Sequence, residues 1–270
     1  MLIGNARPIG IFDSGIGGLT IAQAVTTLLP HENIIYFGDT AHVPYGDKST
    51  STIQSYCLKI CDVLLEEGCK LILVACNSAS AAAFDLMKSH IGSRAAILSV
   101  IDPMVEYLGQ YYANKTVGLI GTRQTVNSLV YNQKINELNR HIHLKTLATP
   151  LLVPLIEEGL HQSNIMQELV CHYLSQKTLA GIDALILGCT HYPLVRSYID
   201  QFYQGRVEVI DSPQIMACAL QEFLQTHHLA NPESRRQMRF YLSDYTEAFQ
   251  QAAKLFFGEE IIFEHYSFTD

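Results

Sequence analysis

Two cysteines stand at equivalent places in the chain, each after a short apolar run and before a segment of helical periodicity. Cys76 follows Leu71–Ala75, and Cys189 follows Ala184–Gly188. If the two runs are strands of similar lobes, both thiols reach the cleft between the lobes from opposite sides. A thiolate on one face of a bound carbon acid removes a proton, while the opposite thiol donates one to the other face. Such a pair inverts a stereocentre.

Polar residues gather at the same strand ends, where parallel α/β sheets hold their ligands. Asp13 and His191 are placed to orient a thiol or to relay its protons, although a helix cap and a core histidine are their alternatives. The helix expected after each cysteine favours the thiolate through its free N–H groups. The same strand ends carry hydroxyl and amide groups that could bind a carboxylate and an ammonium. Each of these residues, taken singly, could instead cap a helix. They are Ser14, Asn77, Ser78, Thr122, Thr125 and Thr190.

The sequence argues against a metal site and a disulfide framework. Seven cysteines are an odd number, and their spacing is irregular. Cys57 and Cys61 have ordinary helical spacing, and no further ligands cluster around Cys189 and His191. Five cysteines are expected to serve as small buried hydrophobes: Cys57, Cys61, Cys69, Cys171 and Cys218.

A glycine-rich loop after the first strand suggests a dinucleotide site. Gly15–Gly18 has the wrong spacing, because Thr20 stands where the last glycine of that motif belongs. Asp13 would also repel a pyrophosphate. We therefore expect no cofactor.

Short apolar runs alternate with segments of helical period, which predicts an α/β protein with mainly parallel sheets. The expected strands are Pro8–Phe12, Asn33–Gly38, Lys70–Ala75, Ala95–Val100, Thr116–Ile120, His143–Thr149, Asp183–Leu187, Val207–Ile210, Met238–Leu242 and Ile261–His265. The expected helices are Gly17–Leu29, Thr50–Glu67, Ser78–Lys88, Thr125–Asn139, Asn164–Gln176, a segment from about Leu194, Ser212–Thr226 and Tyr245–Phe257.

Internal sequence similarity indicates two similar lobes. Pro8–Ser14 resembles Thr116–Thr122, and Leu71–Asn77 resembles Ala184–Thr190, in the same order and at similar separation. Buried strands can resemble one another by chance, but both copies of the second motif carry a cysteine at the same position, directly after the apolar run. The pattern therefore favours a duplicated unit.

Composition excludes several classes of protein. The 270 residues are 48% apolar and 16% charged, with a net charge of −8, which fits a folded core and not a nucleic-acid partner. No secretory signal is visible, and the apolar runs are far shorter than the roughly 18 residues of a membrane span. We expect a cytoplasmic protein that binds neither nucleic acid nor membrane.

Taken together, the motifs resemble those of the glutamate racemases, within the aspartate/glutamate racemase superfamily. The resemblance covers most of the chain and rests on a combination of segments: Ile9–Gly18, Tyr36–Thr40, Pro44–Gly46, Cys76–Ser80, Val153–Gly159 and Gly188–Pro193.

The resemblance implies that Cys76 and Cys189 are the acid/base pair, assisted by Asp13, Glu157 and His191. It also implies a set of residues that bind the amino acid, some of which belong to the catalytic set as well. The binding residues are Asp13, Ser14, Pro44, Tyr45, Gly46, Cys76, Asn77, Ser78, Thr125, Thr190 and His191. Asp39 matches an acidic family position whose role stays open. Ser78 departs from the usual threonine, which keeps the hydroxyl and loosens the fit.

The resemblance further implies two similar doubly wound lobes with the active-site cleft between them. Residues 1–98 and 211–270 form the first lobe, which the tail returns to complete, and residues 99–210 form the second. The implied reaction interconverts L- and D-glutamate without a cofactor and supplies D-glutamate for peptidoglycan. A homodimer is expected. Because Met1–Arg7 alone precede the first strand, we expect no control through an N-terminal extension.

Two alternatives stay open at this point. Within the superfamily, the substrate could be aspartate, a hydantoin or maleate. His191 favours glutamate, since relatives acting on aspartate generally carry a glutamate there. A two-lobed amino-acid binding module of periplasmic type is the alternative outside enzymes, and the paired cysteines and missing signal count against it.

Overall fold

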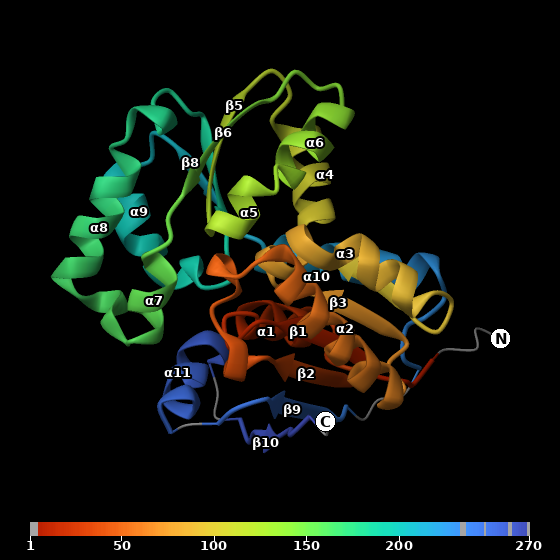
Figure 1. Ribbon diagram of the computed structural model, residues 1–270. Helices are drawn as coiled ribbons and strands as arrows, with labels where there is room; N and C mark the ends of the chain where they lie inside the picture. The colour runs from red at the N-terminus through yellow and green to blue at the C-terminus, as the bar shows by residue number, and fades with distance from the viewer. Residues whose placement is uncertain (1–4, 233–235, 246, 259–260, 269–270) are drawn as a thin grey trace.

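The computed structural model describes residues 5–232, 236–245, 247–258 and 261–268, and they form two parallel sheets (Figure 1). The first sheet lies in the lower half of Figure 1 and the second in the upper half. In spatial order the first sheet contains β10 Glu264–His265, β9 Met238–Leu242, β2 Ile34–Gly38, β1 Ile9–Asp13, β3 Leu71–Val74 and β4 Ala96–Ser99. The second contains β6 His143–Ala148, β5 Thr116–Gly121, β7 Ala184–Gly188 and β8 Glu208–Ile210.

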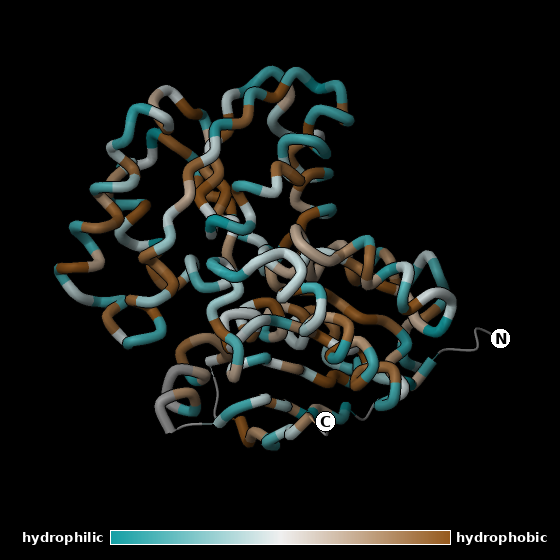
Figure 2. Tube along the Cα trace, in the orientation of Figure 1, coloured by the Kyte–Doolittle hydropathy of each residue, from teal (hydrophilic) through white to brown (hydrophobic). Residues whose placement is uncertain are grey.

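Helices cover both faces of the first sheet, and the apolar runs of its strands reflect that cover. Ile9 and Ile11 of β1 belong to a core with α1 Leu19–Leu28 and α10 Pro213–Thr226. Phe12 belongs to a core with α2 Thr50–Glu66 and α3 Asn77–Ile91. Successive residues of a strand point to opposite faces, so a strand covered on both sides must be apolar throughout. Figure 2 shows these strands as hydrophobic segments inside the molecule.

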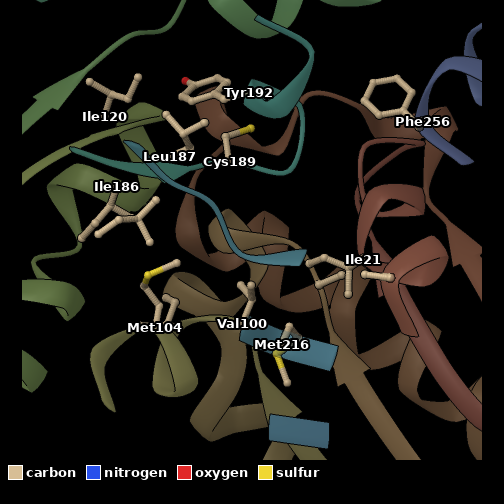
Figure 3. Packing of buried hydrophobic residues seen from close by; sticks show 14 of the residues in the cluster. Ile21, Val100, Met104, Ile120, Ile186, Leu187, Cys189, Tyr192, Met216 and Phe256 are labelled. Atoms are coloured by element: carbon tan, nitrogen blue, oxygen red, sulfur yellow. The ribbon is translucent and has the colours of Figure 1, made fainter. Parts of the chain in front are cut away.

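The helices of the second sheet close the rest of the core. They are α4 Ile101–Tyr111, α5 Arg123–Asn127, α6 Val130–Glu137, α7 Leu152–Glu157, α8 Asn164–Leu174 and α9 Arg196–Tyr203. One apolar cluster runs through both lobes, and Figure 3 shows Ile21 of α1, Met216 of α10, Met104 of α4 and Ile186 of β7 in it. The two sheets are therefore joined by packed side chains as well as by the chain.

The tail of the chain returns to the first sheet, as the resemblance implies. β9 pairs with β2 in parallel, with Tyr36 opposite Phe240, and α11 Glu247–Phe257 packs against α1. The residue bounds of the two lobes stay a prediction. Within the first lobe, residues 1–4, 233–235, 246, 259–260 and 269–270 lie outside the described residues.

The sequence analysis missed two helices and joined two others into one. α4 was not predicted; its Pro103 lies in the first turn, where a helix needs no N–H donor. Residues 125–139 form two helices, because Leu129 takes a left-handed conformation with φ of 59°. α7 is also a helix that the periodicity did not indicate, and it carries Glu157.

A buried ionic network lies at the end of the first sheet where β3 begins. The Lys70 ammonium donates hydrogen bonds to the carbonyl of Asn5 and to Glu32 Oε2, both at 2.6 Å. Glu32 Oε1 accepts from the backbone N–H of Asn231 at 2.7 Å. Lys70 and Glu32 are 1% and 3% exposed. The network connects the start of β1, the loop after α1 and the chain that leads to β9.

Candidate active site

The carboxyl ends of the central strands of both sheets meet at one small cavity. Ala75 and Cys76 follow β3, and Cys189 follows β7. Figure 3 shows Cys189 beside Tyr192 where β7 ends. The cavity is lined by Ser14, Val43, Pro44, Tyr45, Gly46, Cys76, Asn77, Ser78, Thr122, Val153, Cys189, Thr190 and His191. Its volume of about 20 Å³ has room for roughly one water molecule, so an amino acid requires its walls to move apart.

A larger cavity, of about 420 Å³, lies between α3, β4, α4 and α10. Its lining includes Lys88, Glu106 and Glu222 and no cysteine. The residues whose chemistry the sequence singled out therefore converge on the small cavity and not on the large one.

Cys76 caps helix α3 with its sulfur. Its Sγ accepts a hydrogen bond from the backbone N–H of Ala79 and donates one to Ser14 Oγ, both at 3.4 Å. Burial raises the pKa of Cys76 to about 12, as does the charge of Asp13, while the bonds to Ser14 and Ala79 lower it. The helix N-terminus does favour the thiolate, but burial outweighs it. Without a ligand, Cys76 is therefore a neutral thiol.

This pKa predicts the pH dependence of Cys76 alkylation by iodoacetamide. Since only the thiolate reacts and its pKa is about 12, the rate rises throughout the range from about pH 7 to pH 10. Cys171 of α8 and Cys218 of α10 were expected to be buried, but both are exposed on the solvent side of their helices. They therefore serve as internal controls for the activity of the reagent at each pH. Mass spectrometry of the alkylated peptides measures all three rates. A plateau for Cys76 below about pH 9 contradicts the burial argument.

Cys189 forms a chain with a histidine and a carboxylate. His191 Nδ1 lies 3.8 Å from Cys189 Sγ, and its Nε2 is paired with Glu157 of α7. Burial alone lowers the pKa of His191, but Glu157 and Cys189 outweigh it and hold this pKa well above its usual range. Phe256 of α11 contacts the imidazole edge-on, with ring centroids 5.4 Å apart. A protonated His191 thus places a donor beside Cys189.

Asp13 lies behind the cavity and is fully buried. Its carboxylate accepts from the backbone N–H of Gly15 at 2.9 Å and from Thr190 Oγ1 at 3.2 Å. Burial raises the pKa of Asp13, against the lowering effects of His191 and these hydrogen bonds. Asp13 comes from the first sheet and Thr190 from the second, so this hydrogen bond crosses the cleft.

Comparison with known proteins shows which family this chain belongs to. The model of the Asp/Glu/Hydantoin racemases matches residues 19–220, a range that includes both cavity cysteines. The chain belongs to this racemase family. Among curated relatives, glutamate racemase of Neisseria meningitidis serogroup B is 41% identical over 257 residues, 95% of this chain and 94% of the relative. Glutamate racemase 3 of Caldanaerobacter subterraneus is 37% identical over 249 residues, 92% of this chain and 90% of the relative.

Solved racemase structures have the same two-lobed fold. The crystal structure of Francisella tularensis glutamate racemase in complex with D-glutamate matches with a TM-score of 0.90 and 35% identity, over 98% of both chains. The Thermus thermophilus enzyme in complex with beta-chloro-D-alanine matches with a TM-score of 0.86 and 35% identity, over 98% of both chains. The family and fold class predicted from the sequence are thereby confirmed.

The racemase fold brings most of the predicted site residues to the cavity wall. Asp13, Glu157 and Thr125 do not line it and instead contact residues that do. Thr125 Oγ1 lies 3.1 Å from Thr122 Oγ1, which in turn lies 2.8 Å from Ser78 Oγ across the cleft. The described residues include no cluster of His, Cys, Asp and Glu that could hold a metal, and within them no helix has the length and apolarity of a membrane span.

The structure shows which residues contact Asp39, whose role the sequence left open. Asp39 is buried behind Tyr45 and accepts hydrogen bonds from Tyr45 Oη at 2.5 Å, from His42 Nδ1 at 2.8 Å and from Ser243 Oγ at 2.7 Å. Ser243 directly follows β9. Asp39 therefore anchors the loop of Pro44–Gly46 to the tail of the chain.

Close packing explains one glycine of the loop after β1. A Cβ on Gly17 would come within 2.4 Å of His191 Nδ1 and within 2.6 Å of Thr190 Oγ1. The loop takes glycine there because the first lobe touches the second at this point, not because a dinucleotide binds.

Sequence reasoning missed Val43 and Val153 in the cavity wall and Tyr131 behind it. The two valines give no chemical signal. Tyr131 donates a hydrogen bond to Asn77 Oδ1 at 2.8 Å, and nothing in a helical pattern distinguishes such a tyrosine from ordinary core.

Proposed function

We propose that this chain interconverts L- and D-glutamate by direct exchange of the α-proton, with Cys76 and Cys189 as the two acid/base residues. The observation that carries the proposal is the position of the two thiols, one from each sheet, on a single cavity. Similarity to glutamate racemases over more than nine-tenths of the chain supports the choice of substrate.

In the proposed reaction, the thiolate on one face of the substrate takes the α-proton and becomes a thiol. The opposite thiol gives its proton to the other face of the α-carbon and becomes a thiolate. No atom is gained or lost, and the enzyme ends with its proton on the opposite cysteine. The ammonium of a bound amino acid offsets the burial of Cys76, because a nearby positive charge favours the thiolate.

The carbanionic charge that develops at the α-carbon needs electrostatic stabilisation. α3 begins at Asn77, so its free N–H groups lie at the cavity and favour negative charge there. On the other side, protonated His191 supplies a positive charge and a donor beside Cys189, and Glu157 keeps that charge in place. Asp13 holds Thr190 and balances the charge of His191.

The polar residues of the cavity wall are proposed to hold the ammonium and the carboxylates of glutamate. They are Ser14, Asn77, Ser78 and Thr190. Thr125 lies behind Thr122 and supports it. Pro44, Tyr45 and Gly46 form the part of the cavity wall that the loop contributes. Ser78, which replaces the family threonine, keeps its hydroxyl on Thr122. Its missing methyl leaves the substrate a looser fit.

Replacing Glu157 with glutamine is expected to move the alkaline limb of the kcat/KM profile to lower pH. Glu157 raises the pKa of His191, so its loss lets the imidazole lose its proton at a lower pH. Glu158→Gln changes the exposed neighbour and is expected to leave the profile in place. Identical profiles for Glu157→Gln and the wild type would exclude the role of this carboxylate.

The decisive test incubates the purified protein with either glutamate enantiomer in deuterated water, without added cofactor. We expect deuterium at the α-carbon of the newly formed enantiomer, measured by mass spectrometry after chiral separation. Parallel reactions with aspartate, a hydantoin and maleate test the related substrates. Turnover of one of these without turnover of glutamate overturns the substrate assignment, and a requirement for pyridoxal phosphate overturns the chemistry.

A homodimer, a cytoplasmic location and a supply of D-glutamate to peptidoglycan complete the proposal, all three following from the resemblance. Light scattering after size-exclusion chromatography tests the dimer. Depletion of the protein in its own cell tests the pathway, since growth should then depend on added D-glutamate.

A further inference from the structure

One buried donor in the cavity wall has no hydrogen-bond partner among the described residues. Asn77 is 3% exposed and lines the cavity. Its Oδ1 accepts a hydrogen bond from Tyr131 Oη at 2.8 Å, while its Nδ2 is buried and has no hydrogen-bond partner in the part of the chain that the structure describes. A buried amide donor that stays unpaired costs free energy. Such a group in a cavity wall is available to an acceptor on a ligand.

Tyr131 decides which end of the Asn77 amide stays unpaired. The tyrosine is 2% exposed on α6, which belongs to the second lobe, whereas Asn77 begins α3 of the first. Within the described residues, the Tyr131 hydroxyl has no hydrogen-bond acceptor besides Asn77 Oδ1. If the amide turned over, Nδ2 would donate to this hydroxyl, and the buried O–H would lose its acceptor. The observed orientation pairs both groups, so it is favoured.

The hydroxyl keeps its proton throughout the neutral range. Burial and then the charge of Asp102 raise the pKa of Tyr131 above its ordinary value. Tyr131 is therefore a permanent donor to Asn77 Oδ1, and the amide cannot reverse without leaving that donor unpaired.

We propose that Tyr131 is a positioning residue: it fixes the Asn77 amide so that Nδ2 faces the cavity and donates to a carboxylate oxygen of the substrate. The inference rests on the proposed function, because it takes the ligand to be an amino acid with a carboxylate. Since the two residues come from different lobes, the donor is set only while the lobes are in contact.

The test compares Tyr131→Phe with the wild type in steady-state racemisation of both enantiomers. Phenylalanine keeps the ring and removes only the hydroxyl, so the amide is free to present Oδ1 to the carboxylate. We expect KM for L- and D-glutamate to rise about tenfold to a hundredfold, the effect of one hydrogen bond to a charged group. We expect kcat to stay within about threefold, because binding in the ground state and the transition state weakens alike. An unchanged KM, or a loss confined to kcat, overturns the inference.

A double-variant cycle separates positioning from general loss of packing. If Tyr131 acts through Asn77, the double variant Tyr131→Phe/Asn77→Ala has the KM of Asn77→Ala alone. Multiplied effects of the two changes overturn the inference. Tyr203→Phe is the matched control, since Tyr203 of α9 carries a buried hydroxyl that has no hydrogen-bond partner among the described residues. Its KM should equal that of the wild type. A wild type that neither binds nor racemises glutamate overturns the proposed function as well, whereas an active wild type with an unaffected Tyr131→Phe overturns the inference alone.

Discussion

Alanine in place of either Cys76 or Cys189 is expected to reduce racemisation of glutamate by roughly 10²–10⁴-fold or more, the range for loss of a positioned acid or base. Alanine neither accepts nor donates a proton, and the remaining cysteine reaches only one face of the α-carbon. Each variant should still exchange the α-proton of one enantiomer with deuterated water, and the two variants should differ in which enantiomer that is. Chiral separation with mass spectrometry measures both reactions.

The other cysteines provide controls for this prediction. Cys57→Ala removes a fully buried thiol, and Cys171→Ala removes an exposed one. Neither residue lines the cavity, so neither change should lower kcat beyond the effect of reduced stability. Undiminished turnover in Cys76→Ala or in Cys189→Ala would remove that residue from the mechanism.

Lys70→Met is expected to lower the free energy of unfolding by about 3–5 kcal/mol, the usual effect of breaking a buried ion pair on one side. Methionine fills a similar volume but leaves the Glu32 carboxylate buried, with the Asn231 N–H as its one remaining donor among the described residues. Urea denaturation followed by circular dichroism measures the change. The residues concerned lie at the start of β3, away from the cavity at the other end of the strands.

Two variants make this prediction specific. Lys70→Met/Glu32→Gln removes both charges and should be more stable than Lys70→Met alone. Lys115→Met breaks an exposed pair with Asp183, whose side chains are 54% and 44% exposed, and should cost less than about 1 kcal/mol. If Lys70→Met costs no more than Lys115→Met, the buried network does not contribute to stability.

The class of fold and the two cysteines could be predicted because both depend on local patterns. A strand covered on both faces is apolar throughout, so β1, β3 and β7 stand out as short runs. In parallel sheets the residue that follows each run lies at the same edge, which places Cys76 and Cys189 where a ligand binds.

Contacts between distant residues could not be predicted in this way. Tyr131 and Asn77 are 54 positions apart, and Asp39 and Ser243 are 204 apart, with no periodicity to connect them. The protonation state of Cys76 could not be predicted from the sequence either. Its position before a helix favours the thiolate, but the degree of burial, which only the packed structure provides, reverses that preference.

The return of the tail to β2 has a consequence for synthesis. A ribosome completes the strands of the second sheet before Met238–Leu242 emerges, so the lobe begun first is finished last. Until then the nascent chain presents an open edge along β2, a surface on which strands of other chains can pair. The loop around Tyr45 also lacks the hydroxyl of Ser243 that helps hold Asp39. Translation that stops before Met238 therefore yields a fragment with an open edge along β2 and without the Ser243 contact to Asp39.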